Sequence, residues 1–313
     1  MNRRKILLLL LLPLLLPVGC IKEDYRNCPT GLYVTFEPKN PKHDYSELVV
    51  EVNLYFYDSD GNLKADFHYF RDELRPHDRA AFVPSIPIGD YSLVAVVNGH
   101  QDYETYGIEN YATLCTKVRQ DTVSNKLTDF FTSEKQISIG SRQGGGIQTE
   151  KMMLAKHNNE IRLKILYDGY IAPVNTVLEA YAEESSGLFF YSTYSSLATR
   201  HVRYQPWDIL LGNQGLPLQF DISVFRLWIG SDANICLRET EVLTGIGTER
   251  FYTLNITDAL ITVKNSANEY LYNTNEKLEY TDEYEITMTL GKDFVILSLS
   301  INNWYIIGGG VEV

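Results

Sequence analysis

The chain has 313 residues, of which 44% are hydrophobic and 22% are charged, and its formal net charge at pH 7 is −12. This hydrophobic content is ordinary for a globular protein, and the length suits one or two domains. The acidic balance argues against nucleic acid or an anionic membrane surface as a partner, because both attract Lys and Arg. The 22 Tyr and 13 Phe, with few stretches typical of helices, point to β structure.

The chain opens with the pattern of a secretory signal. Basic residues over 3–5 precede a leucine-rich apolar run over 6–18, which is shorter than the roughly 20 residues of a membrane-spanning helix. Gly19 and Cys20 follow, an order that resembles the lipobox of bacterial lipoproteins, in which the cysteine receives lipid and becomes the new N-terminus. Pro17 stands where that motif usually has leucine, so an ordinary signal peptide is the alternative. We expect a lipid on Cys20.

Short segments in which apolar and polar residues alternate make up most of the remaining chain. This period of two predicts half-buried strands. Between two of them, residues 58–62 predict a hairpin turn in which Gly61 adopts a positive φ. The predicted strands are 31–37, 49–57, 67–70, 91–97, 161–167, 218–224, 252–256, 286–290 and one long apolar strand over 294–307.

Residues 100–133 lack a clean period, and we expect a short helix over 108–114 and an ordered loop over 127–133. Many short strands without regularly interspersed helices indicate β-sandwiches. The fold class is therefore all-β, and the length suits two sandwiches better than one. The expected organisation is a signal peptide (1–19), a lipidated tether (20–30), an N-terminal sandwich (31–155) and a C-terminal sandwich (156–313).

No motif for catalysis, phosphate binding or metal binding occurs in the sequence. Residues 58–61 resemble a calcium loop, but with Gly61 as its sixth residue the first and last ligand positions fall on Phe56 and Phe67, which supply no oxygen. The six histidines are scattered, and His68 reads as an exposed strand residue. We expect no catalytic residue, no cofactor and no metal, although the plentiful carboxylates leave a glycosidase pair open.

With Cys20 acylated, an odd number of cysteines remains. Export permits a disulfide, and Cys28 with Cys115 is the first pair to consider. Cys236 lies in an apolar segment and is expected to be a buried thiol.

Aromatic side chains could also form a sugar-binding platform, for which Trp207, Trp228 and Trp304 are the candidates. Most aromatic residues of a β-sandwich are instead core residues. Asp121-Thr122-Val123 resembles the short motif at which exported proteins of the Bacteroidales receive O-glycans, and a plain loop is the alternative.

Four stretches together resemble the FimB/Mfa family of fimbrial anchor lipoproteins from the Bacteroidales. They are the lipidation and Cys-Pro segment over 20–29, the strand and hairpin over 52–61, the Pro-x-Gly-x-Tyr strand over 86–99, and the segment over 152–165. The resemblance implies two tandem transthyretin-like β-sandwich domains with Greek-key-type connections and no enzymatic activity. It also implies a place at the base of a fimbria (pilus), where the protein ties the fibre to the outer membrane and influences its length and retention.

The same resemblance gives a meaning to the acidic tether. Lys22, Glu23 and Asp24 are similar to the signal that sends such lipoproteins to the outer face of the outer membrane. A solvated charged tether without a sorting role is the alternative. We expect the protein to face the cell exterior.

The partners implied by the resemblance are fimbrial (pilin) subunits, bound by β-strand addition. The candidate strands are 31–37 and 294–307, unless both simply complete their own domains. A fimbrial shaft or tip subunit is an alternative, but no arginine between Pro38 and Phe70 offers the cut by which shaft subunits lose their first strand. A surface glycan-binding lipoprotein is the other alternative.

Overall fold

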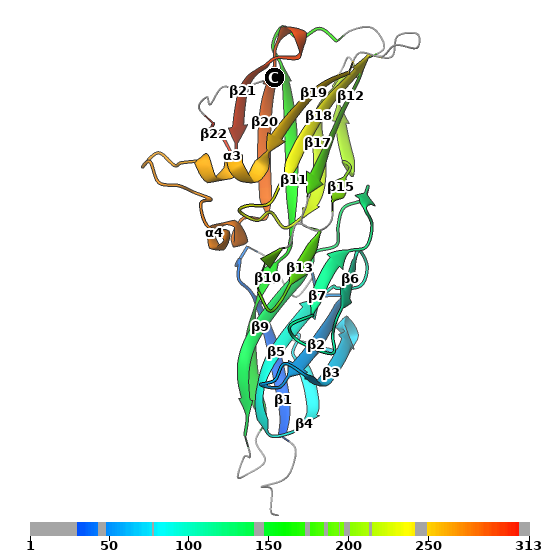
Figure 1. The fold of residues 1–313 in the computed structure, drawn as a ribbon, viewed down its shortest axis with the longest axis vertical. Helices are drawn as coiled ribbons and strands as arrows, with labels where there is room; N and C mark the ends of the chain where they lie inside the picture. The colour runs from blue at the N-terminus through cyan, green and yellow to red at the C-terminus, as the bar shows by residue number, and fades with distance from the viewer. Residues whose placement is uncertain are drawn as a thin grey trace, which may run out of the picture.

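The computed structural model describes residues 30–42, 48–76, 78–140, 147–172, 176–184, 187–193, 195–196, 201–212, 215–241 and 249–306. These residues are mostly strands, which confirms the all-β class. Figure 1 shows two stacked parts, here called the first half (residues 30–156) and the second half (residues 158–306). Among the described residues, no helix has the length and apolar character to cross a membrane.

The main sheet of the first half has the strand order β3-β2-β5-β9-β10-β1-β4. Its last strand in the chain, β10, pairs in parallel with β1 along Gln148–Leu154 but pairs with β9 only at Ala155 and Lys156. The sheet therefore folds over at β10, and β1 and β4 face β2, β5 and β9 across one apolar cluster, the first core. The strands are β1 (Thr30–Pro38), β2 (Glu51–Tyr57), β3 (Leu63–Phe70), β4 (Ala81–Ile86), β5 (Gly89–Val97), β9 (Phe131–Ile139) and β10 (Gln148–Lys156).

A small sheet with the order β14-β13-β7-β6 covers the other face of β2 and β5. Its strands are β6 (Tyr103–Tyr106), β7 (Cys115–Val118), β13 (Leu188–Phe190) and β14 (Ser195–Ser196). Tyr57 of β2 and Val94 of β5 pack there with Tyr103 and Val118, in a second cluster called the shared core. Because β2 lies between two layers, all of its residues are buried.

The second half is a sandwich of two sheets, with the orders β16-β17-β11-β20-β21-β22 and β19-β18-β12-β15-β8. Both sheets contribute apolar residues to the shared core, for example Leu163 and Ile286 from one and Leu237 from the other. The strands are β8 (Thr122–Val123), β11 (Asn158–Tyr167), β12 (Thr176–Glu184), β15 (Val202–Tyr204), β16 (Asp208–Leu211), β17 (Pro217–Phe225), β18 (Asn234–Glu241), β19 (Glu249–Asn255), β20 (Glu283–Leu290), β21 (Ile296–Ile301) and β22 (Trp304–Tyr305). The described part of the second half also contains the helices α3 (Ile256–Thr262) and α4 (Asn275–Glu279) and a 3₁₀ turn at Lys292–Phe294, and the first half has a 3₁₀ turn at Arg71–Glu73.

The two halves exchange strands. β13, from the second half of the chain, pairs with β7, and β8, from the first half, pairs in parallel with β15. At the junction the Phe130 ring stacks on Tyr103 with centroids 4.6 Å apart and lies 6.3 Å from the Phe225 ring of β17. The chain passes from one half to the other at His157, but the shared core crosses this point. The domain division at 155/156 and the transthyretin-like topology stay predictions.

Most of the predicted strands and the hairpin turn are confirmed. Gly61 has φ +78° and its N–H donates to the Asp58 carbonyl at 2.9 Å. The helix expected over 108–114 is wrong, because turns connect β6 and β7 there. Part of the loop expected over 127–133 is wrong as well, since β9 begins at Phe131.

The end of the chain also differs from expectation. The long strand predicted over 294–307 is wrong, because Asn302 and Asn303, with φ of 50° and 67°, make a two-residue hairpin turn between β21 and β22. The strand predicted over 252–256 stops one residue early. Asn255 ends β19 and caps α3, since its side chain accepts a hydrogen bond from the Asp258 N–H at 3.0 Å.

Candidate functional site

The two candidate strands for exchange with a partner, 31–37 and 294–307, both take part in the chain's own sheets. β1 lies between β10 and β4, while β21 pairs with β20 along its length and with β22 at Ser300 and Ile301. The alternative interpretation, in which both strands complete their own half, describes them better. β1 has no open edge, so any pairing site for a partner would lie on another strand.

One such place is the groove between β9 and β10. It has a volume of about 670 Å³ and is lined by Lys39, residues 132–136 and residues 151–153. β9 uses its other edge to pair with β5, and β10 uses its other edge to pair with β1. In the described part of the chain, no strand lies between these two facing edges.

Side chains bridge this groove in place of a strand. Lys135 Nζ of β9 donates to the Lys151 carbonyl of β10 at 3.3 Å and to the Glu150 carboxylate at 2.7 Å. Gln148 Nε2 of β10 donates to the Ser138 carbonyl of β9 at 3.1 Å. These two carbonyls are main-chain acceptors that an added strand would otherwise use. The groove therefore offers two strand edges held by exchangeable polar side chains.

A second exposed edge is β16, at the rim of the six-stranded sheet. All of its residues are exposed, including Ile209 (46%), Leu210 (56%) and Leu211 (58%). An exposed apolar edge strand tends to bind other chains. β16 is thus an exposed apolar edge strand of the second half.

A smaller pocket lies beside Trp207. It has a volume of about 260 Å³ and is lined mainly by charged residues. The Trp207 indole N–H donates to Glu160 Oε2 at 3.3 Å, and the Lys126 ammonium lies 5.3 Å from the ring centroid. Burial raises the pKa of the Glu160 carboxyl, against the opposing effect of Lys126. Of the three predicted platform residues, Trp207 is 37% exposed, whereas Trp228 and Trp304 are half-buried.

The structure places only some of the predicted site residues. Cys115 lies in β7 as a buried free thiol, 3.9 Å from the Tyr106 carbonyl, and burial raises its pKa. Cys236 in β18 is a buried thiol, as expected. Thr122 is exposed in β8, and its glycosylation stays a prediction. Three further predictions concern residues outside the described part of the chain. They are the lipid on Cys20, the export signal at Lys22, Glu23 and Asp24, and the pairing of Cys28 with Cys115.

Solved structures share this fold. A candidate polysaccharide-binding protein from Bacteroides thetaiotaomicron superposes with a TM-score of 0.72 at 18% identity, over 88% of this chain and 97% of that chain. A candidate adhesin from Bacteroides ovatus gives a TM-score of 0.68 at 13% identity, over 91% of this chain and 97% of that chain. The fimbrial anchor protein Mfa2 from Porphyromonas gingivalis gives a TM-score of 0.66 at 16% identity, over 89% of this chain and 99% of that chain. At these identities the likeness shows the fold.

Among curated proteins, none matches the sequence of this chain. A family model does match it, over residues 25–308, and so covers both halves of the molecule. That model describes the fimbrillin-A associated anchor proteins Mfa1 and Mfa2. The chain therefore belongs to this family of fimbrillin-A associated anchor proteins, and its role is associated with fimbriae.

Proposed function

We propose that this protein is an outer-membrane lipoprotein that holds a fimbria at its base and influences the length and attachment of the fibre. The observation that carries the proposal is the family match over residues 25–308, which begins directly after a lipidation motif at Cys20. A base subunit needs a membrane anchor, a rigid body and a site for one fibre subunit. The lipid supplies the first, and the continuous shared core supplies the second.

The groove between β9 and β10 is the proposed site for the fimbrial subunit. A strand entering it would replace the side-chain bridges of Lys135 and Gln148 with main-chain hydrogen bonds. The Leu154 carbonyl bonds the Lys39 N–H on the β1 side, and main-chain groups of successive strand residues point to opposite edges. The N–H of Met153 therefore faces the groove.

Substituting the lipidated cysteine tests the anchoring role. We expect Cys20→Ala to leave fimbrial subunits at normal levels but to release assembled fibres into the medium. Cys236→Ala, which removes a thiol far from the lipidation motif, serves as the control and should keep fibres on the cells. Cell-attached fibres in the Cys20→Ala strain, measured by fractionation and electron microscopy, would contradict the proposal.

A proline at the groove edge tests strand addition. Met153→Pro removes one N–H from the open edge and leaves the ladder between β1 and β10 intact, so it should abolish co-purification with the fimbrial subunit. Met153→Ala removes only the side chain, and binding should persist because strand addition uses the main chain. If Met153→Pro and Met153→Ala reduced co-purification with the fimbrial subunit equally, the groove would not be the site of strand addition.

A surface glycan-binding role is the second candidate. It is favoured by the exposed Trp207 beside the polar pocket, because sugars stack on aromatic rings while their hydroxyls bond to carboxylates. It is also supported by the shared fold of the candidate polysaccharide-binding protein. Glycan-array binding that disappears with Trp207→Ala but not with Trp304→Phe would establish this role.

A further inference from the structure

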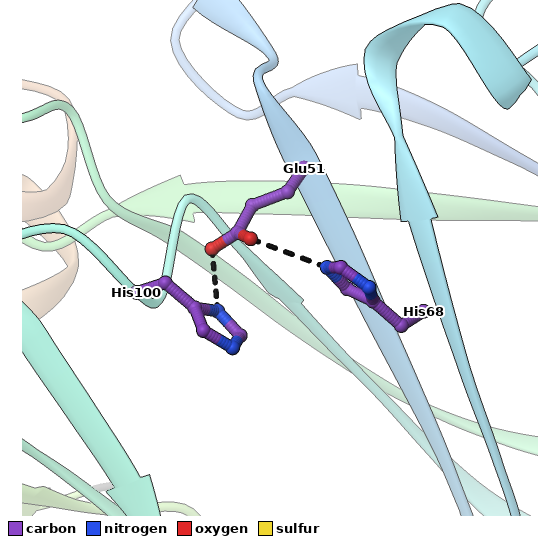
Figure 2. A group of neighbouring side chains, drawn as sticks. All are labelled: Glu51, His68 and His100. Atoms are coloured by element: carbon purple, nitrogen blue, oxygen red, sulfur yellow. Dashed lines mark hydrogen bonds and ion pairs between the residues drawn. The ribbon is translucent and has the colours of Figure 1, made fainter.

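Three side chains from separate segments converge at one end of β2. Glu51 is the first residue of β2, His68 lies on the neighbouring strand β3, and His100 follows β5. Figure 2 shows both imidazole rings directed at the same carboxylate, with Glu51 Oε2 at 3.2 Å from His68 Nε2 and Glu51 Oε1 at 2.6 Å from His100 Nδ1. The two rings lie 5.5 Å apart between centroids.

The strand register explains this meeting. Glu51 stands opposite Phe70 and Asn53 opposite His68, so Glu51 and His68 are diagonal neighbours on one face of the β2–β3 ladder. β5 pairs with β2 on its other side, and this pairing brings the segment that follows β5 to the same end.

Asn98 holds in place the segment after β5, which carries His100. It is buried, adopts a positive φ of 59°, and its Oδ1 accepts hydrogen bonds from the N–H groups of Val50 (2.8 Å) and Glu51 (3.3 Å). Its Nδ2 donates to the carbonyls of Leu48 and Asp129, both at 2.8 Å. These hydrogen bonds hold the main chain on either side of the cluster in place.

The burial of the three groups is unequal. The Glu51 side chain is 9% exposed, against 38% for His68 and 59% for His100. A buried carboxylate is costly unless a cation or several donors compensate its charge. A cation seated among the three groups would supply the compensating charge. The outer side of such a site faces solvent.

We propose that Glu51, His68 and His100 bind one divalent transition-metal ion of the zinc type. Their three ligand atoms all lie within 4.8 Å of one another. Ligand atoms around tetrahedral zinc lie about 3.4 Å apart, given bonds of about 2.0–2.1 Å, so small side-chain rotations complete the geometry. Two imidazoles and one carboxylate suit zinc, copper or nickel, while Ca²⁺ and Mg²⁺ prefer oxygen ligands. A water molecule would occupy the fourth position, on the exposed side.

Calorimetric titration of the tag-free mature protein with ZnCl₂, after dialysis against a chelator, tests the site. We expect one equivalent of Zn²⁺ to bind with a rise in Tm, and Mg²⁺ to produce neither effect. His68→Gln combined with His100→Gln should weaken binding at least about tenfold, because loss of ligands costs at least as much as the loss of their supporting contacts. His201→Gln, an exposed histidine of the second half, should bind Zn²⁺ as the wild type does.

A second variant separates binding from folding. Glu51→Gln keeps the shape of the side chain, and its circular dichroism should match that of the wild type while Zn²⁺ binding weakens. Co²⁺ titrated into the wild type should give the visible absorption of a tetrahedral complex, and the double histidine variant should not. Absence of one-equivalent Zn²⁺ binding, or binding that the double variant retains, would overturn the proposal.

Discussion

The two halves of the molecule build their cores in different ways. The first half stacks three layers, so its central strand β2 is buried at every position. The second half is a two-layer sandwich, and its central strand β20 alternates between buried and more exposed residues. The comparison of β2 with β20 shows that a strand covered on both faces loses the period of two in its burial, whatever the intrinsic preference of its residues.

The halves nevertheless form one body at their junction. The Glu279 carboxylate of α4 lies 3.0 Å from Lys39 Nζ of the first half and 3.2 Å from Arg226 of the second. Asn40 Nδ2 donates to Asp282 across the same boundary at 2.8 Å. With the exchanged strands and the shared core, these contacts indicate that the two halves unfold together.

Truncating a residue of the first core is the strongest test of this coupling. Phe56 is fully buried and packs edge-on against Phe67 and Tyr91, so Phe56→Ala should cost about 3–5 kcal/mol. All three tryptophans lie in the second half. Tryptophan fluorescence and circular dichroism should therefore report the same shifted transition in urea.

A matched control for that experiment lies in the shared core. Phe130→Ala at the junction should cost a similar amount, about 3–5 kcal/mol, and should shift both probes equally. If Phe56→Ala left the fluorescence transition in place while Phe130→Ala moved it, the halves would be independent folding units.

The buried ion pair at the junction should give the next largest effect. The side chains of Arg226 and Glu279 are only 4% and 8% exposed, so Glu279→Gln should cost about 3 kcal/mol by leaving a buried guanidinium without this carboxylate. Lys39→Ala, at a partly exposed side chain, should cost less than about 1 kcal/mol. Replacement of both Arg226 and Glu279 by Met should recover most of the stability. If Glu279→Gln and the double Met variant lost equal unfolding free energy, this account of the ion pair would be contradicted.

The junction should also make stability depend on pH. Burial, with smaller contributions from Arg226 and Lys39, holds the pKa of His157 well below its ordinary value. Below about pH 6.5 this histidine is protonated in the unfolded chain but stays neutral in the folded protein. The free energy of unfolding should therefore fall by up to about 1.4 kcal/mol for each pH unit by which the pH is lowered. Urea unfolding at pH 7.5 and 5.5 measures this loss. His157→Gln should reduce the dependence, whereas His201→Gln should not.

The smallest effect concerns a local feature of the second half. Asn255 caps α3 through the Asp258 N–H, so Asn255→Ala should lower the unfolding free energy by about 1 kcal/mol. Asn255→Asp keeps the accepting oxygen and should cost little. Thermal unfolding followed by tryptophan fluorescence measures the difference, and equal losses in both variants would show that the cap does not contribute.

Local patterns predicted the features that depend on neighbouring residues. Alternation identified β11, β17 and β20, and the Asp58–Asn62 turn followed from its glycine and aspartates. The strand β9 was missed because two polar residues, Ser133 and Lys135, interrupt its apolar period. Its main partner strand, β5, lies more than 30 residues earlier in the chain, and no local signal identifies that pairing.

The cluster at Glu51 was missed for a related reason. Histidines 32 residues apart in the sequence show no metal-ligand spacing, and only the pairing of β2 with β3 and β5 brings them together. One usable signal was present. The predicted hairpin at 58–62 brings β2 and β3 side by side, but only the register shift between Phe56 and Tyr57 sets Glu51 diagonal to His68, and nothing in the sequence placed His100 beside them.

The position of β1 has a mechanical consequence. A pull on a tether attached at Thr30 would act along the axis of β1, which is bonded on one side to β10 from Leu32 to Pro38 and on the other side to β4. Such a force loads both ladders in shear, so many hydrogen bonds must break at once. A strand pulled from its end at right angles to a ladder would instead peel away one bond at a time. The rate of forced unfolding is set by this barrier rather than by equilibrium stability, so the sheet order itself would resist extraction of the strand next to the tether.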